Sequence, residues 1–254
     1  MKTIFVTGAT CELGREICRQ LLDRPCNLIL TARSNERLQS LRADLHKKNI
    51  TVIPSDFTDI NTFSSAIECV SSVANEGIDG VVLIPPQPDA TTEIFPSAEK
   101  WNELFMKSFI GPSVLLGKLL PFLQKSDSSV VLISGISSKQ PFSNYTTSNT
   151  IRTAWLGFAK TVADNIGPKN IRFNTLSCGG IMTEKFERKL AEEANKNHLS
   201  VSEILKNRVD NIPLRRYAEK SEIADTVCFL LLSLASRHIT GQNIAFDGGF
   251  SRSY

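Results

Sequence analysis

Short runs of β-branched and other apolar residues alternate with longer amphipathic runs along the chain. Continuous apolar runs are typical of strands that are buried on both faces of a sheet. They predict strands at residues 2–8, 26–33, 50–56, 80–85, 128–134, 171–177 and 243–249. The amphipathic runs predict helices at residues 12–23, 35–48, 60–76, 101–125, 149–166 and 222–234. This alternation predicts a doubly wound, Rossmann-type α/β fold, with a parallel sheet of about seven strands and helices on both faces.

One segment lies outside this alternation. Residues 183–217 form a charged, helix-like excursion between the sixth and seventh predicted strands. An insertion there would lie above the carboxyl ends of the strands, where doubly wound sheets bind their ligands. We therefore expect residues 1–254 to form a single domain, with 183–217 as a substrate lid.

The composition narrows the function classes. The chain has 254 residues, and its 29 basic and 26 acidic residues are spread along it, so a nucleic-acid partner is not expected. The N-terminus enters a strand at once, without a basic and then apolar leader, and no continuous apolar run reaches the roughly 18 residues of a membrane span. We expect a cytoplasmic protein without a membrane partner. The six cysteines and three histidines lack metal-ligand spacing, so no metal site is predicted.

Four segments, in this order, carry a resemblance to a known family. They are "TGATCELG" (7–14), "SDFTD" (55–59), "NIRFNTLSCGGIMT" (170–183) and the run from "IPLRRYAEKSE" to "TGQNIAFDGG" (212–249). Together they resemble the short-chain dehydrogenase/reductase family over essentially the whole chain. The resemblance implies an oxidoreductase that binds a nicotinamide cofactor and a small-molecule substrate.

The resemblance also implies which residues hold the cofactor. By position these are Gly8, Thr10, Leu13, Gly14, Arg33, Asp56, Phe57, Gly179, Ile181 and Thr183. At the end of the second strand, Arg33 follows a small residue, and a guanidinium there favours NADP(H) because it can hold a 2′-phosphate by two hydrogen bonds. The alternative is a solvated arginine at a helix start.

Two departures put the cofactor site in question. Glu12 replaces the middle glycine of the first turn, where backbone normally approaches the pyrophosphate. Its carboxylate would either repel the phosphates or act as a first-turn helix acid with its side chain in solvent. After the fourth strand, "LIPP" (83–86) replaces the family's Asn-Asn-Ala-Gly, and its two prolines remove two backbone donors.

The catalytic positions also differ from the family pattern. Tyr145 matches the tyrosine that donates the proton, but the lysine four residues later is Asn149, which can hold the ribose and brings no charge. The substrate-polarising serine falls at Gly135, so either Ser137 or Ser138 supplies a hydroxyl instead, or this segment is only a polar turn. The helix asparagine that tethers a relay water in many members falls at Ser108.

Arg152 is the nearest basic residue to replace the lysine. It lies seven residues after Tyr145, on the same helical stripe, and this spacing is similar to that of the enoyl-reductase branch of the superfamily. Arg152 is either the cation of the site or a charge on the helix surface.

The losses favour reduction over oxidation. An ordinary phenol, with a pKa near 10, is protonated at neutral pH and can donate a proton, whereas alcohol oxidation needs the phenolate. We expect an NADP(H)-dependent reductase of a small carbonyl, enone or quinone-like metabolite. The alternatives are a non-redox enzyme that catalyses elimination, isomerisation or cyclisation, and a non-catalytic member. The resemblance further implies a homodimer or homotetramer that pairs through the helices at 101–125 and 149–166.

Overall fold

The computed structural model describes residues 1–74, 77–89, 91, 93–123 and 127–253. Its centre is a seven-stranded sheet, and every neighbouring pair of strands in it is parallel. The predicted fold class is confirmed. In spatial order the strands are β3 (Ile50–Pro54), β2 (Cys26–Ala32), β1 (Lys2–Val6), β4 (Gly80–Leu83), β5 (Ser128–Gly135), β6 (Ile171–Cys178) and β9 (Asn243–Phe246).

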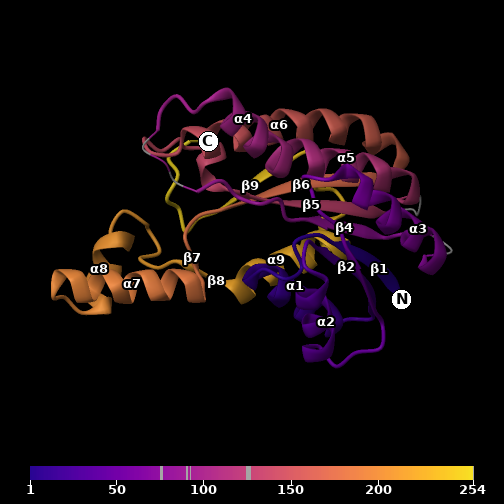
Figure 1. The fold of residues 1–254 in the computed structure, drawn as a ribbon, viewed down its shortest axis with the longest axis horizontal. Helices are drawn as coiled ribbons and strands as arrows, with labels where there is room; N and C mark the ends of the chain where they lie inside the picture. Colours follow the sequence, from indigo (N-terminus) through magenta and orange to yellow (C-terminus); the bar gives the residue numbers. More distant parts are fainter. Residues whose placement is uncertain (75–76, 90, 92, 124–126, 254) are drawn as a thin grey trace.

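Helices cover both faces of this sheet (Figure 1). One face carries α1 (Glu12–Leu22), α2 (Asn35–Asp44) and α9 (Lys220–Leu232). The other carries α3 (Phe63–Val73), α4 (Ala98–Phe105), α5 (Gly111–Leu119) and α6 (Thr146–Ile166). Each layer has its own apolar cluster, so the burial of these two helix faces against the central strands stabilises the domain.

Several predicted element boundaries differ from those observed. The helix predicted at 35–48 ends at Asp44, because His46 takes a left-handed conformation with φ 47°. The strand predicted at 80–85 ends at Leu83, before the two prolines that cannot donate to a neighbouring strand. The predicted helix ends at 75–76 and 124–125 lie outside the described residues.

The helix predicted at 101–125 starts earlier and is interrupted. Ser97 accepts a hydrogen bond from the Lys100 N–H and begins α4 at Ala98, and a π-helical turn, η2 (Met106–Ile110), separates α4 from α5. The run Ala98–Phe122 has the length and apolar composition of a membrane span, with a mean hydropathy of 1.2. Because Leu115, Leu116 and Leu119 are buried in the core on the sheet, we interpret the run as a core helix.

The segment predicted as a lid folds as a helical hairpin. It consists of α7 (Glu184–Asn197) and α8 (Val201–Val209), which pack on each other through Leu190, Ala194 and Ile204. A two-stranded ribbon of β7 (Ile181–Met182) and β8 (Ala218–Glu219) joins it to the domain. The hairpin projects away from the sheet (Figure 1). Short 3-10 turns complete the described elements, at Ile60–Thr62, Leu120–Phe122, Ile136–Ser138, Gly167–Lys169 and Leu234–Ser236.

Two glycines of α5 test how closely this helix approaches the loop after β3. A Cβ at Gly111 would lie 2.0 Å from the Phe57 carbonyl oxygen, whereas a Cβ at Gly117 would meet no atom within 4 Å. Gly111→Ala should lower the free energy of unfolding by about 1–3 kcal/mol or more, because backbone must move. Gly117→Ala should leave it unchanged or raise it by up to about 1 kcal/mol. Urea denaturation measures both, and equal stabilities for the two variants would contradict the packing described.

Candidate active site

The turn between β1 and α1 is closely packed around two glycines. Gly8 has φ 60°, and a Cβ on it would lie 2.9 Å from the Ile84 carbonyl oxygen. A Cβ on Gly14 would lie 2.4 Å from the Gly8 carbonyl oxygen. The Cys11 thiol caps α1 by accepting the Gly14 N–H at 3.2 Å. These contacts explain both glycines. The turn lies at the carboxyl end of β1, and the start of a helix at that edge of a sheet is the usual place for an anion.

Glu12 neither points freely into solvent nor faces the start of its own helix. Its carboxylate accepts hydrogen bonds from the Glu184 N–H at 2.7 Å and the Lys185 N–H at 3.3 Å, and it pairs with the Lys220 ammonium at 3.1 Å. Burial raises the pKa of Glu12, but the hydrogen bonds from Glu184, Lys220 and Lys185 outweigh it, and the pKa is lowered overall. Glu12 is an acid in the first turn of α1, but the alternative with its side chain free in solvent is wrong.

The other expected cofactor residues near the N-terminus line the ends of β1, β2 and β3. Thr10 lies in the turn before α1 and Leu13 is buried in its first turn, while Arg33 is exposed directly after β2. The Asp56 carboxylate accepts the N–H and hydroxyl of Thr58, and Phe57 packs edge-on against Phe63. Their position at one edge of the sheet agrees with the prediction, and their contacts to a cofactor stay predictions.

The end of β6 brings the remaining expected cofactor residues close to α7. The Gly179 N–H donates to the Phe246 carbonyl at 2.9 Å, and Ile181 pairs with Ala218 in the ribbon. The Thr183 hydroxyl caps α7 by accepting the Phe186 N–H at 3.2 Å. Thr183 thus connects the expected cofactor site to the base of the helical hairpin.

Tyr145 is held at the start of α6 by the loop before it. Its ring packs on that of Phe142, with centroids 5.3 Å apart, and Phe142 in turn contacts Phe250 at 5.7 Å. Asn149 donates to the Phe142 carbonyl at 2.9 Å and accepts the Phe142 N–H at 3.4 Å. Because both polar atoms of the Asn149 amide are engaged by the backbone of Phe142, we revise its expected role from ribose contact to support of this loop.

Arg152 points inward and lies over Gly135. A Cβ on Gly135 would lie 2.3 Å from Cζ of Arg152, so the guanidinium fills the space of the missing side chain. Nη1 donates to the Ser137 hydroxyl and Nε to the Gln87 side-chain oxygen, both at 2.9 Å. The interpretation of Arg152 as a solvated surface charge is wrong.

The electrostatics link this arginine to Tyr145. Burial lowers the pKa of Arg152, whereas Tyr145 and Cys178 raise it through their charges when ionised. Burial raises the pKa of Cys178 itself to about 12, so its thiol stays neutral at physiological pH. Arginine remains protonated in proteins, and Arg152 is therefore a fixed cation that contacts Ser137 and Gln87.

Ser108 lies in the π-helical turn rather than in a regular helix. Its side chain is buried, and its hydroxyl has no hydrogen-bond partner among the described residues. Its carbonyl oxygen accepts the indole N–H of Trp155 at 2.8 Å. Trp155 therefore contacts the backbone of Ser108, while the Ser108 hydroxyl, expected to hold a relay water, has no protein partner among the described residues, and its role stays a prediction.

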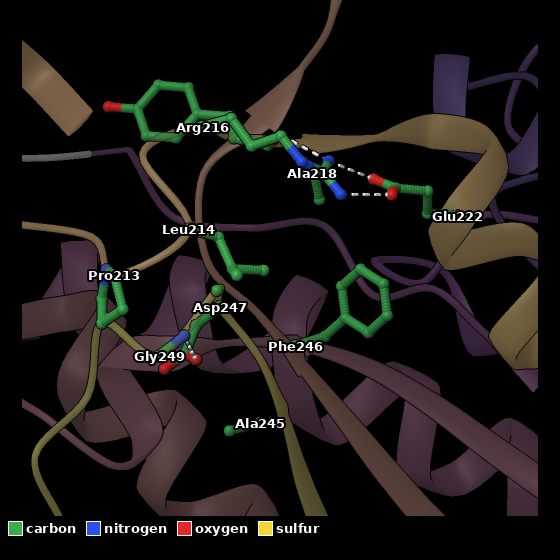
Figure 2. Close-up of a pocket in the computed structure, with 11 residues that line it drawn as sticks. Pro213, Leu214, Arg216, Ala218, Glu222, Ala245, Phe246, Asp247 and Gly249 are labelled. Carbon is green, nitrogen blue, oxygen red and sulfur yellow. Dashed lines mark hydrogen bonds and ion pairs between the residues drawn. The ribbon is translucent and has the colours of Figure 1, made fainter. Parts of the chain in front are cut away.

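Two cavities flank these residues. One, of about 490 Å³, lies between residues 213–218 and the end of β9. Figure 2 shows Leu214 and Phe246 pointing toward it, and Arg216 paired with Glu222 at its rim. The second, of about 240 Å³, is lined by Gln87 and Thr147 among others. The smaller cavity is the more relevant to the chemistry, because it shares Gln87 with the Arg152 cluster, whereas the larger shares no residue with that cluster.

Comparison with known proteins shows the family to which the chain belongs. A family model described as enoyl-(acyl carrier protein) reductase matches residues 8–251, nearly the whole chain. The chain belongs to the short-chain dehydrogenase/reductase family. The suspected family is thereby confirmed, and it is a family of oxidoreductases.

Individual relatives are distant but cover the full length. The chain is 25% identical to the NADPH-dependent reductase BacG of Bacillus subtilis (strain 168), over 99% of this chain and 98% of that protein. Among solved structures it is similar to a short-chain oxidoreductase from Pseudomonas aeruginosa PAO1, described as containing an atypical catalytic center. The TM-score is 0.90, with 22% identity over 100% of this chain and 98% of that one. L-sorbose reductase from Gluconobacter frateurii, in complex with NADPH and L-sorbose, also gives a TM-score of 0.90 at 22% identity, over 100% and 97% of the two chains.

Several residues that contact the candidate site residues do not belong to any of the family-like segments of the sequence. Gln87 follows the two prolines, Phe142 precedes Tyr145 by three residues, and Trp155 lies ten residues after it. Trp155 falls on the same helical stripe as Arg152, at a spacing of three, so helical periodicity could have placed it beside Arg152. The contacts of Gln87 and Phe250 join segments that are far apart in the sequence, so no local sequence pattern predicts them.

Gly135→Ala tests whether the missing side chain makes room for Arg152. The added methyl group would displace a flexible guanidinium and not backbone, so we expect a stability loss below about 1 kcal/mol. The displaced guanidinium would leave Ser137 and Gln87, and NADPH oxidation with any accepted substrate should fall by at least about 10-fold. Thermal unfolding and steady-state rates measure the two effects, and unchanged rates would mean that Arg152 does not need this space. Gly157→Ala, where a Cβ meets nothing within 4 Å, is the matched control.

Proposed function

We propose that this protein is an NADP(H)-dependent reductase of a small carbonyl, enone or quinone-like metabolite. Tyr145 is the proton donor, and Arg152 is the cation that replaces the family lysine. The observation that carries the proposal is the guanidinium over Gly135, bonded to Ser137 and electrostatically coupled to Tyr145. The guanidinium of Arg152 thereby stands near the positions of two family residues that this chain lacks. These are the lysine next to the tyrosine and the serine that contacts the substrate oxygen.

The turn before α1 fits a nicotinamide dinucleotide. Gly8 and Gly14 let the turn pack tightly against Ile84 and on itself, and Leu13 is buried in the first turn of α1, so the start of the helix is held at the carboxyl end of β1. Arg33 stands exposed at the end of β2, where its guanidinium would hold a 2′-phosphate. The relative BacG is named as NADPH-dependent, and L-sorbose reductase is described with NADPH bound, which supports the same cofactor here.

The chemistry divides between the cofactor and the chain. The reduced cofactor, when bound, supplies a hydride to the electrophilic carbon of the substrate. Tyr145 gives its hydroxyl proton to the substrate oxygen, or to the carbon that becomes carbanionic in an enone, and becomes a phenolate. Arg152 stabilises that phenolate, and the Ser137 hydroxyl that it holds can donate to the substrate oxygen.

Reprotonation does not need the family's relay water. Tyr145 is partly exposed at the start of α6, so solvent can return its proton directly. The carbonyl of Ser108 is meanwhile occupied by the Trp155 indole. These two features favour a reductase that works on substrates with little need for further polarisation, such as quinones, enones and β-dicarbonyls.

The enzyme is also proposed to be a cytoplasmic homodimer or homotetramer, with the α7–α8 hairpin as its substrate lid. Only 39% of the most apolar part of Ala98–Phe122 is buried within one chain, and Ile110 on that run is 40% exposed. A second copy would cover this surface. Light scattering of the purified protein should give at least twice the chain mass of 28.1 kDa, and a monomer at micromolar concentration would refute the assembly.

Variants of the two proposed catalytic residues test the chemistry. NADPH oxidation would be measured with a quinone, an enone, a β-dicarbonyl and a simple ketone. Tyr145→Phe removes the proton donor and Arg152→Met removes the cation, and each should lower the rate by about 100-fold or more. Arg152→Lys keeps the charge without the span to Ser137 and Gln87, and should recover only part of the rate.

The control is Lys160→Met, an exposed cation later on α6, which should leave the rate unchanged. Product formed from substrate without NADPH would support a non-redox enzyme instead. The absence of NADPH binding at millimolar concentration would end the reductase proposal.

A further inference from the structure

Glu12 joins three element starts at one point. It is the first residue of α1, and its carboxylate reaches the first turn of α7, about 170 residues later, and Lys220 at the start of α9. The first amides of a helix have no partner within the helix. In α7 the Glu184 and Lys185 N–H groups are taken by Glu12, and the Phe186 N–H by Thr183. The cofactor turn thus supplies most of the N-terminal cap of α7.

This contact lies at the base of the proposed lid. The α7–α8 hairpin packs mainly on itself, and it enters and leaves the domain through the β7–β8 ribbon. Tyr217, directly before β8, lies against Gly180, where a Cβ would approach its ring to 2.3 Å. The link to Glu12 is therefore a side-chain tie between the base of the hairpin and the turn that would hold the cofactor phosphates.

The negative charge of Glu12 is paired with the positive charge of Lys220. The carboxylate stands beside the helix start where a diphosphate would bind, and two negative groups there would repel each other. Lys220 pairs with Glu12, and both side chains are 28% exposed, so the pair is only partly screened by water. Lys220 is the countercharge that makes a carboxylate acceptable in place of the family's glycine.

We propose that Glu12 is a positioning residue that ties the α7–α8 lid to the cofactor turn, with Lys220 as its obligatory countercharge. The proposal rests on the proposed binding of NADPH at the α1 turn. Cofactor binding and the order of the lid are then linked, and the linkage is reciprocal: NADPH orders the hairpin, and the ordered hairpin retains NADPH. Thr183, which begins α7, moves with the lid and is placed against the cofactor by the same tie.

Hydrogen exchange tests the tie on the full-length protein. In the wild type, NADPH should slow exchange in the peptides that span residues 184–209. Glu12→Ala removes both acceptors, so amides at the start of α7 should exchange at least 10-fold faster without cofactor, and NADPH should no longer protect the hairpin. Glu12→Gln keeps an acceptor without charge and should give an intermediate result. Unchanged exchange in Glu12→Ala would overturn the tie.

NADPH titrations test the countercharge through a double-mutant cycle. Lys220→Met leaves the carboxylate unpaired and should weaken NADPH binding at least 10-fold. The double variant Glu12→Gln with Lys220→Met removes that carboxylate as well and should recover most of the loss. Additive effects in the double variant would overturn the role of Lys220.

The proposed tie between Glu12 and the hairpin can be tested separately from the proposed reductase function. Asp23→Asn removes an acid at the C-cap of α1, one that pairs with Arg19 and lies at the other end of the helix from Glu12, and should change neither exchange of the hairpin nor NADPH affinity. If the wild type does not bind NADPH, the reductase proposal fails, while faster exchange at the start of α7 in Glu12→Ala still supports the tie.

Discussion

The guanidinium of Arg152 occupies space that any side chain at position 135 would need, and the other features of the site follow from this constraint. With Gly135 in place, the guanidinium can turn inward from α6 and reach Ser137 and Gln87. A buried cation needs such partners, because an ammonium or guanidinium without them is costly to remove from water. The loop after β4 supplies Gln87, so its departure from the family's polar sequence is part of the same arrangement.

The same constraint changes the interpretation of Asn149. Two basic residues, a lysine at 149 and an arginine at 152, would lie one turn apart on the same helical stripe and repel each other. With the charge at 152, position 149 is free for a structural role, and its amide holds the backbone of Phe142, whose ring packs on Tyr145. The residues at 135, 149 and 152 are therefore linked: Gly135 leaves room for the guanidinium of Arg152, and Asn149 supports the loop before Tyr145.

The sequence was sufficient for the fold, whereas the contacts among the candidate site residues had to come from the structure. Seven strands and their order of helices follow from hydrophobic periodicity, which depends on local spacing. The sequence did not decide whether the Arg152 side chain points inward. Helical spacing shows which residues share a face of the helix, but it does not show whether that face is buried. The role of Glu12 was missed altogether, since no local pattern connects residue 12 with the N–H groups of residues 184 and 185.

Both long-range features share one physical logic. A position where the family has glycine holds an acid at 12, and a position where it has serine holds glycine at 135. Each of these two replacements changes the side-chain volume and the charge at its position. In both cases a charged side chain from another element lies at that position. Lys220 approaches the added carboxylate, and Arg152 enters the vacated space. Unpaired charges in partly buried sites are unfavourable, so each of these residues is found together with a partner of matching charge or volume. A comparison with the family motif at one position at a time shows only that a residue is missing, because the partner lies on another element.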